Sequence, residues 1–310
     1  MEGGSPLPVR EGGRKQGTKG MAKIGVFDSG YGGLTILESI RRALPEYDYL
    51  YLGDNARAPY GTHSFDVIYR YTLQAVRYLL EQDCALVILA CNTASAKALR
   101  TIQQKDLPEI NRTLQNKSYI VNRPIVNVLG VIRPTVEAVP GITRNGHVGI
   151  LATPATVSSG SYVLELEKTS ATPLTVTQQA CPMWVPLIEA GEHRNAGADY
   201  FVDLYLRQIF AQDPLIDTLV LGCTHYPLLR DKISSRLPSV TPRPVRIISQ
   251  GELVADSLAD YLHRHAEYAE QLSRGGTCCC MTTENADRFA QSASVFLDTP
   301  VTAEHVDLSY

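Results

Sequence analysis

Two cysteines stand in similar surroundings that favour acid–base chemistry. Each ends an aliphatic run typical of a buried strand and is followed by hydroxyl or amide side chains. The two segments are Ala90-Cys91-Asn92-Thr93-Ala94 and Gly222-Cys223-Thr224-His225-Tyr226. A helix N-terminus lowers the pKa of a thiol, so both cysteines are candidate thiolates. The N–H groups there, together with Asn92, Thr93 and Thr224, can bind a carboxylate, and His225 is placed to polarise or reprotonate Cys223.

The other cysteines favour simpler interpretations. A single buried cysteine is usually a small apolar side chain, and we interpret Cys84 and Cys181 in that way. The run Cys278-Cys279-Cys280 suggests a metal site, but adjacent strand residues point to opposite faces of a sheet. Because no Cys-x-x-Cys pair accompanies the run, we predict no metal site.

Two turns follow predicted strands and leave two interpretations open. Asp28-Ser29-Gly30-Tyr31-Gly32-Gly33 is either an anion-binding helix N-terminus or a plain turn capped by Asp28 or Ser29. Pro59-Tyr60-Gly61 is either a rigid turn that presents a hydroxyl and backbone groups to a ligand, or an ordinary loop.

Strands and helices alternate along the chain. Short apolar runs predict strands over 23–27, 48–52, 85–90, 119–121 or 125–128, 147–152, 174–180, 217–222, 245–249, 278–282 and 304–308. Amphipathic segments predict helices over 32–43, 64–82, 93–104, 131–139, 155–168, 183–190, 197–211, 226–236, 251–265 and 285–297. This alternation is typical of βαβ units, so the expected fold class is α/β with mostly parallel sheets.

The chain is weakly duplicated, which predicts two similar α/β lobes. Strands at 24–27 and 148–151 each precede one of the two cysteine-ending strands by a similar distance. Ligands bind at the carboxyl ends of strands in open α/β sheets, so the site is expected in the cleft between the lobes. We assign a disordered tail to 1–20, a first lobe to 21–118 and 250–310, and a second lobe to 119–249. The polar segment 105–124 is expected to be an irregular crossing between lobes.

Composition excludes several classes of protein. The 310 residues carry a net charge of −3, so no global field favours binding to nucleic acid or to an anionic membrane. No apolar run reaches the roughly 18 residues of a membrane span, and the N-terminus has no apolar region typical of a signal peptide. Seven cysteines are an odd number and do not indicate a disulfide framework. We expect a cytoplasmic protein.

These motifs together resemble the cofactor-independent aspartate/glutamate racemase family, and specifically its glutamate racemases. The resemblance rests on Asp28-Ser29-Gly30, Pro59-Tyr60-Gly61 and the two cysteine segments, and it runs in order from residue 23 to the end of the chain. It implies an isomerase that interconverts L- and D-glutamate without a cofactor or metal and supplies D-glutamate for peptidoglycan, the polymer of the bacterial cell wall. It also implies a homodimer, and the last stretch folding back onto the first lobe.

The resemblance further assigns roles to residues. Cys91 and Cys223 are the two catalytic bases, acting on D- and L-glutamate respectively, and Asp28 and His225 assist their proton transfers. The residues that contact the substrate are Asp28, Ser29, Tyr60, Gly61, Asn92, Thr93, Thr224 and His225. Relatives more often carry Asp-Ser-Ala where this chain has Ser249-Gln250-Gly251, and an acid where it has Arg133.

Four other functions remain as alternatives. Aspartate racemisation is the nearest, because the motifs are shared between the two specificities. A thiol hydrolase or transferase would use Cys223 with His225 but would leave the Cys91 segment without a role. A decarboxylase on the same fold would be expected to have a single cysteine, and an amino-acid-binding regulator to lose one of the two thiols.

Overall fold

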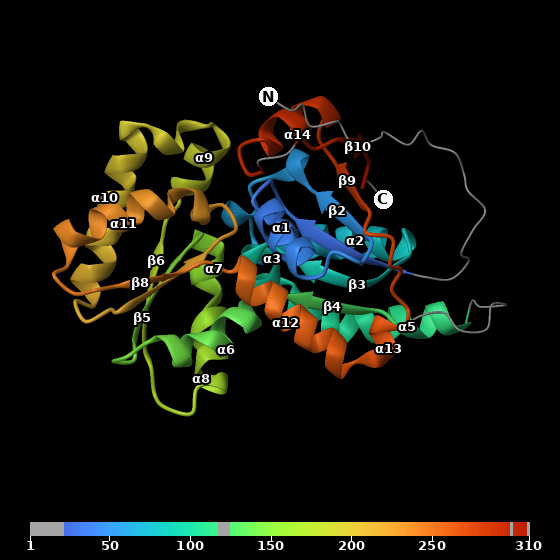
Figure 1. Ribbon diagram of the computed structural model, residues 1–310, viewed down its shortest axis with the longest axis horizontal. Coiled ribbons are helices and arrows are strands. Elements are labelled where there is room, and N and C mark those ends of the chain that lie inside the picture. The colour runs from blue at the N-terminus through green and yellow to red at the C-terminus, as the bar shows by residue number, and fades with distance from the viewer. Residues whose placement is uncertain (1–21, 117–124, 298–299, 309–310) are drawn as a thin grey trace, which may run out of the picture.

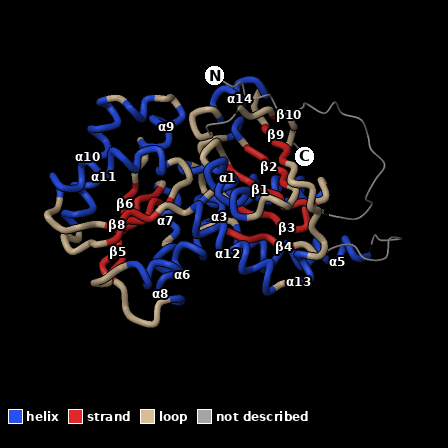
Figure 2. The backbone as a smooth tube through the Cα atoms, viewed as in Figure 1, coloured by secondary structure: helices blue, strands red, loops and turns tan. Residues whose placement is uncertain are grey.

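The computed structural model describes residues 22–116, 125–297 and 300–308 and shows two α/β lobes side by side. In Figure 1 the first lobe lies on the right, and the second lobe, with β5, β6 and β8, lies on the left. Figure 2 shows that each lobe has a central group of strands with helices packed around it. The predicted α/β class with mainly parallel sheets is confirmed.

The first lobe is built on a six-stranded parallel sheet. Its strand order is β10-β9-β2-β1-β3-β4. The strands are β1 (Lys23–Asp28), β2 (Tyr49–Gly53), β3 (Cys84–Leu89), β4 (Asn127–Gly130), β9 (Cys278–Thr282) and β10 (Ala303–His305). Strands β1, β2 and β3 are almost entirely buried, which explains their continuous apolar sequences.

The second lobe repeats part of this arrangement in a four-stranded parallel sheet. Its order is β6-β5-β7-β8, formed by β5 (His147–Ala152), β6 (Thr175–Ala180), β7 (Thr218–Gly222) and β8 (Arg246–Ile248). The order matches β2-β1-β3-β4 of the first sheet, so the weak duplication in the sequence corresponds to a repeated topology. Cys91 follows β3 and Cys223 follows β7, at equivalent strand ends.

Helices cover both sheets. Those of the first lobe are α1 (Gly33–Ala43), α2 (Phe65–Glu81), α3 (Asn92–Lys97), α4 (Leu99–Thr101), α5 (Leu107–Asn116), α12 (Gly251–Arg264), α13 (Ala266–Ala269) and α14 (Ala286–Ala293), with a π-helical turn at Ile102–Asp106. Those of the second lobe are α6 (Ile132–Ile142), α7 (Pro154–Ser159), α8 (Ser161–Thr169), α9 (Trp184–Glu189), α10 (Ala196–Gln212) and α11 (Arg230–Val240). Short 3₁₀ turns occupy Asn55–Arg57, Tyr60–Thr62, Glu192–Arg194 and Tyr226–Leu229.

Local chemistry fixes where the site helices begin. Cys91 is the N-cap of α3, and its sulfur accepts a hydrogen bond from the N–H of Ala94. Thr153 is the N-cap of α7, its hydroxyl accepts from the N–H of Thr156, and Pro154 occupies the first turn. Both caps lie at strand ends in the cleft, so the residues that start these helices also face the site.

The structure corrects the expected lobe boundary and the crossing segment. Strand β4 pairs with β3, for example Val128 with Val87, so the chain changes sheet after Gly130 and not at 119. Residues 107–116 form helix α5, with Leu107 packed against the core of the first lobe, where an irregular segment was expected. Strands β9 and β10 return to the first sheet. The predicted tail at 1–20 lies outside the described residues.

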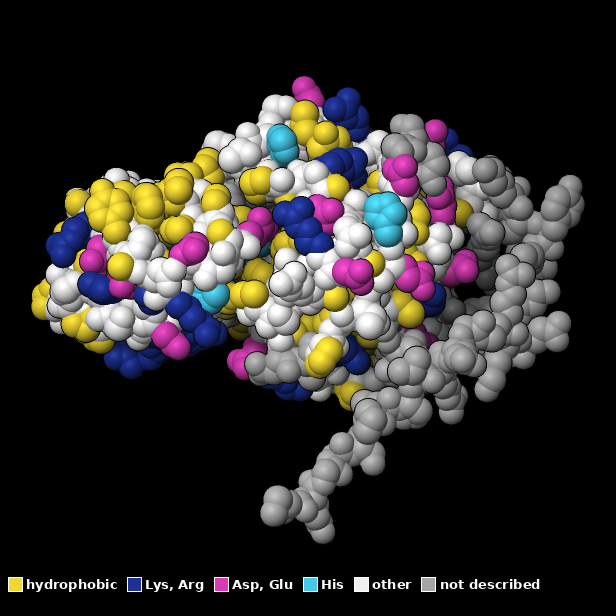
Figure 3. Space-filling view, turned by 90° about the horizontal axis from the view of Figure 1, so that it is seen from above, with side chains coloured by type: hydrophobic (Ala, Val, Ile, Leu, Met, Phe, Trp, Pro, Cys, Tyr) yellow, Lys and Arg dark blue, Asp and Glu magenta, His cyan; other side chains and the backbone are white. Residues whose placement is uncertain are grey.

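The described surface carries charges of both signs. Figure 3 shows Lys and Arg side chains interspersed with Asp and Glu over the face seen from above. In this view apolar side chains gather at the left-hand end of the molecule, over the second lobe. Among the large apolar side chains of the described residues, Tyr200 on α10 is 63% exposed. Within the described residues, no helix is both long and apolar enough to cross a membrane.

The packing of the second sheet against α10 is tested by two glycines. A Cβ added at Gly149 on β5 would lie 2.6 Å from Leu219 and 2.9 Å from Ile209, whereas one at Gly141 on α6 would meet nothing within 4 Å. We expect Gly149→Ala to lower the free energy of unfolding by about 1–3 kcal/mol through overpacking. Gly141→Ala is the matched control and should raise it by up to about 1 kcal/mol. Urea unfolding of both variants measures this, and equal effects would contradict the described packing.

Candidate active site

A pocket lies between the lobes at the carboxyl ends of their strands. Its empty volume is ≈ 520 Å³, including space that opens to solvent. The lining residues come from both lobes: Ser29, Ala58, Pro59, Tyr60, Gly61, Thr62, Thr93, Thr153, Pro154, Cys181, Pro182, Val185, Pro186, Glu189, Cys223, Thr224 and His225. Seven of the predicted site residues therefore line one pocket, as expected for the carboxyl ends of parallel strands.

Cys91 lies against the first-lobe side of this pocket. Its sulfur is 3.2 Å from Oγ of Ser29, which lines the pocket. Burial and the neighbouring Asp28 raise the pKa of Cys91 to about 12, although Ser29 and the N–H of Ala94 act in the opposite direction. The expected lowering of this pKa by the helix N-terminus is therefore wrong, because α3 is short and desolvation outweighs its hydrogen bonds.

Asp28 ends β1 and is fully buried beside this cysteine. One carboxylate oxygen accepts from the N–H of Gly30 at 3.0 Å, and the hydroxyl of Thr224 in the second lobe lies 3.5 Å from the other. Burial raises the pKa of Asp28, with His225 opposing the shift. A carboxyl with a raised pKa takes up a proton more readily than an exposed aspartate, so Asp28 is suited to exchange protons with neighbouring groups.

Cys223 is paired with a histidine and a glutamate of its own lobe. Nδ1 of His225 is 3.8 Å from the sulfur of Cys223, and Nε2 is 2.9 Å from Oε1 of Glu189. Burial disfavours the charged ring, but the hydrogen bonds to Cys223 and Glu189 raise the pKa of His225 well above its usual value. The raised pKa favours the protonated ring, which can donate to both partners at once.

The two lobes meet closely around this group. A Cβ at Gly32 would lie only 2.5 Å from Nδ1 of His225 and 2.5 Å from Oγ1 of Thr224. Only glycine permits this approach. From the C-terminal segment, the ring of Phe296 packs edge-on against His225 with centroids 5.4 Å apart. The His225 side chain is therefore covered by residues of both lobes.

The predicted substrate contacts are placed differently from one another. The hydroxyl of Thr93 is 3.0 Å from that of Thr153 across the cleft. Tyr60 and Gly61 line the pocket, but the phenol of Tyr60 donates to the buried carboxylate of Asp54. The amide of Asn92 is bonded at both ends to protein groups, Gln250 and Tyr162. The phenol of Tyr60 and the amide of Asn92 are therefore engaged by protein groups, which leaves, among these residues, the hydroxyl of Thr93 and the backbone of Gly61 as the polar groups at the pocket.

Glu189 is the functional side chain that sequence reasoning missed. It is the last residue of α9, within the predicted helix at 183–190, and lies 36 positions before His225. Nothing local in the sequence links the two residues, since only the fold brings α9 to the end of β7. The sequence therefore carried no signal that singles out Glu189.

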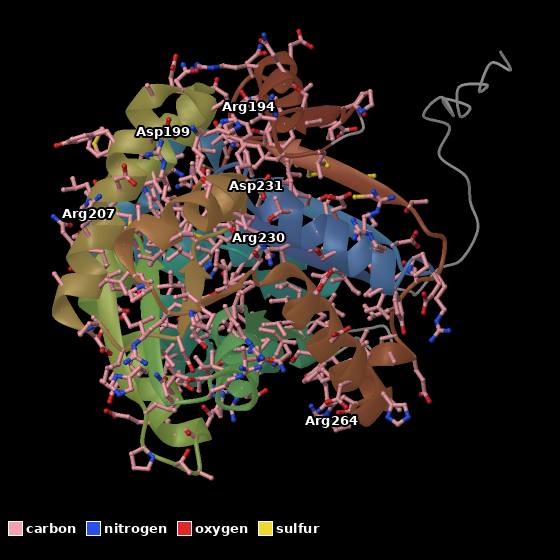
Figure 4. The ribbon with its side chains drawn as sticks, turned by 60° about the vertical axis from the view of Figure 1, so that its left-hand side comes forward. Arg194, Asp199, Arg207, Arg230, Asp231 and Arg264 are labelled. Atoms are coloured by element: carbon pink, nitrogen blue, oxygen red, sulfur yellow. The ribbon has the colours of Figure 1, made fainter. Side chains whose placement is uncertain are left out.

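Of the other five thiols, Cys181 lines the pocket, whereas Cys84 and the three cysteines of β9 do not. In β9, Cys278 is partly exposed, Cys279 is exposed and Cys280 is buried, and no group of three metal-ligating side chains occurs in the part of the chain that the structure describes. Figure 4 labels several charged residues of the second lobe, among them Asp199 on α10 and Arg230 on α11, and neither lines the active-site pocket.

Comparison with known proteins places this architecture in a family. The chain belongs to the Asp/Glu/hydantoin racemase family, whose sequence model matches residues 24–258. The glutamate racemase of Ruegeria sp. (strain TM1040) is 40% identical over 293 residues, which are 91% of this chain and 98% of that protein.

Solved structures give the same assignment. The chain is similar to glutamate racemase from Francisella tularensis in complex with D-glutamate, with a TM-score of 0.76 and 32% identity over 93% of this chain and 98% of that one. It is also similar to glutamate racemase from Thermus thermophilus in complex with β-chloro-D-alanine, with a TM-score of 0.72 and 32% identity over the same shares.

The Glu189–His225 contact predicts a change in titration. Replacing Glu189 by Gln removes a negative charge next to the ring, so the pKa of His225 should fall. A raised pKa stabilises the fold fully below about pH 6.5, and this contribution is lost as the pH rises through the folded pKa. The loss should therefore be complete at a lower pH in the variant, because only the folded pKa has fallen. NMR titration of the imidazole nitrogens measures the shift, with the exposed Glu192→Gln as control. An unchanged His225 titration would contradict the contact.

Proposed function

We propose that this protein interconverts L-glutamate and D-glutamate by a two-thiol mechanism that uses no cofactor or metal. One observation carries the proposal: Cys91 and Cys223 end equivalent strands of two lobes that close on one pocket. Inversion of a carbon centre requires removal of the α-proton on one face and delivery of a proton on the other. Two thiols from opposite lobes suit this task.

The number of protons gained and lost by the two cysteines is equal in each direction of the reaction. A thiolate of one cysteine removes the α-proton and becomes a thiol, while the thiol of the other donates its proton to the opposite face and becomes a thiolate. The raised pKa of Cys91 favours its thiol form in the free site, and the imidazolium of His225 lies beside Cys223. This arrangement suits abstraction from L-glutamate by Cys223 and delivery by Cys91. The starting state is restored when Cys91 gains one proton and Cys223 gives one up, and Asp28 and His225 lie beside these sulfurs to carry that exchange.

A thiolate is a weak base for a carbon acid, so the site must lower the barrier in other ways. Fixed donors around a carbanion, with water excluded, contribute the largest part of such catalysis. The hydroxyls of Ser29, Thr93 and Thr224 and the backbone of Gly61 lie at the pocket to orient the substrate and its carboxylates. Aspartate racemisation is the alternative, and the shorter substrate would reach fewer of these groups.

The test is incubation of each enantiomer of glutamate and aspartate with the protein, without added cofactor. Loss of optical activity by circular dichroism, and α-proton exchange in D₂O by NMR, should occur with both glutamates. Faster reaction of aspartate would assign the alternative. Loss of activity after dialysis against EDTA, restored by metal, would refute the metal-free mechanism.

Each cysteine should be needed for racemisation. We expect Cys91→Ser and Cys223→Ser to lower the rate by about 10²–10⁴-fold, because each turnover needs one abstraction and one delivery. Elimination from a β-substituted glutamate needs only the first step, so Cys91→Ser should retain it with the L-configured analogue and Cys223→Ser with the D-configured one. Chiral chromatography and release of the leaving group measure the two reactions. Cys84→Ser is the matched buried-thiol control, and full racemisation by either variant would exclude that cysteine as a base.

Substrate anchoring is tested at the hydroxyls. Thr93→Val and Thr224→Val keep the side-chain shape but remove a buried polar contact, so KM should rise by an amount equivalent to about 1–3 kcal/mol. Thr72→Val is the control, because its hydroxyl is buried in α2 and bonds only to the carbonyl of Ile68. Steady-state kinetics in both directions measures the effect. Unchanged KM in both site variants would place the anchoring contacts elsewhere.

The same proposal covers the cellular setting. The product D-glutamate would supply peptidoglycan synthesis in the cytoplasm. The enzyme would act as a homodimer. Within each subunit, the two lobes would close around the substrate. The resemblance to the family supports these points. Light scattering of the purified protein measures the oligomeric state.

A further inference from the structure

A buried ring of hydrogen bonds includes the residue that follows Cys91. Nδ2 of Asn92 donates to Oε1 of Gln250 at 2.6 Å, Nε2 of Gln250 donates to the phenol oxygen of Tyr162 at 3.0 Å, and the phenol of Tyr162 donates to Oδ1 of Asn92 at 2.7 Å. All three side chains are buried. Each group donates and accepts within the ring, so the ring holds one arrangement firmly.

The ring joins the lobes at both places where the chain crosses between them. Asn92 begins α3 in the first lobe, and Tyr162 lies on α8 in the second. Gln250 stands between β8 and α12, where the chain returns to the first lobe. Its Nε2 also donates to Oγ1 of Thr135 at 2.8 Å and lies 3.3 Å from the carbonyl of Val131, the first residue after β4. One amide therefore contacts both crossovers.

The backbone of Gln250 is held against the first lobe. Helix α12, which begins immediately after it, packs on α1. A Cβ at Gly251 would lie 2.3 Å from Oγ and 3.1 Å from Cβ of Ser39 on α1, so the two helices are in close contact there. The backbone at Gln250 is therefore held by the first lobe, while its side chain contacts residues of the second lobe.

The ring includes the residue that follows Cys91 but not the residue that follows Cys223. Cys91 precedes Asn92, and its sulfur accepts from the N–H of Ala94 in the same turn, so a shift of Asn92 displaces this sulfur. The residue equivalent to Asn92 after Cys223 is Thr224, whose side chain lies 3.5 Å from Asp28 and outside the ring. Removing the ring should therefore affect Cys91 and leave the Cys223–His225 pair in place.

We propose that Gln250 is a positioning residue that sets the place of Cys91, through Asn92, when the lobes are closed. The inference rests on the proposed function, because it concerns one of the two proton transfers in racemisation.

The test compares kinetic isotope effects in the two directions. Gln250→Ala should lower kcat/KM by roughly 10–100-fold, the usual cost of a misplaced catalytic group. Because only the Cys91 transfer slows, the primary isotope effect with α-deuterated D-glutamate should rise and that with α-deuterated L-glutamate should fall. A loss of folded protein alone would lower the rate and leave both isotope effects at their original values.

Two further variants make the test decisive. Tyr162→Phe removes one member of the ring with little change in volume, and it should give the same opposite shifts and combine less than additively with Gln250→Ala. Gln179→Ala removes a glutamine of the second lobe whose amide bonds to Gln208, and both isotope effects should stay unchanged. If the unmodified protein did not racemise glutamate, the proposed function would fail. If it did and the ring variants kept both isotope effects, the positioning role would be overturned.

Discussion

Two buried thiols at one pocket cannot readily both carry a charge, and the proposed mechanism depends on this constraint. Burial and the neighbouring Asp28 are the largest causes that raise the pKa of Cys91, and a charge on Cys223 would raise it further, so the site favours one thiolate at a time. A two-base inversion requires this condition, since one sulfur must accept a proton while the other gives one. The surroundings of the two sulfurs follow from it, with a buried carboxyl and a hydroxyl beside Cys91 and an imidazolium held by Glu189 beside Cys223.

The repeated topology explains how two thiols from different parts of the chain come to one pocket. Parallel strands bring their carboxyl ends to one edge of a sheet, and two sheets of matching strand order place equivalent strand ends opposite each other. In the proposed mechanism the two cysteines would then approach a substrate from two sides without any change in the fold of either lobe. The chain passes between the two sheets near Val131 and Gln250, and the Gln250 amide contacts both crossovers.

Sequence reasoning predicted the strands and most helices because their apolar periodicities are local. Of the two ranges predicted for the fourth strand, 119–121 or 125–128, the second overlaps β4. The lobe to which this strand belongs was not predicted correctly, since the pairing of β4 with β3 depends on topology and leaves no pattern in the local sequence. Helix α5 was missed because its polar residues outnumber the few that pack on the core. The pKa of Cys91 was predicted in the wrong direction, because sequence shows the helix N-terminus but not the depth of burial. Contacts such as Glu189–His225 join distant residues and require the fold.

The two lobes share a strand order, but the side chains around Cys91 differ from those around Cys223. This difference cannot change the equilibrium between the two enantiomers. L- and D-glutamate have equal free energies in water, so an asymmetric site cannot favour either enantiomer at equilibrium. Asymmetry acts instead on the resting protonation state. Under the proposed mechanism, a site with Cys91 as a thiol and a protonated His225 beside Cys223 would be ready for one enantiomer, and the other would require a prior exchange of protons. Asp28 is buried and interacts electrostatically with both Cys91 and His225, so it is suited to mediate that exchange.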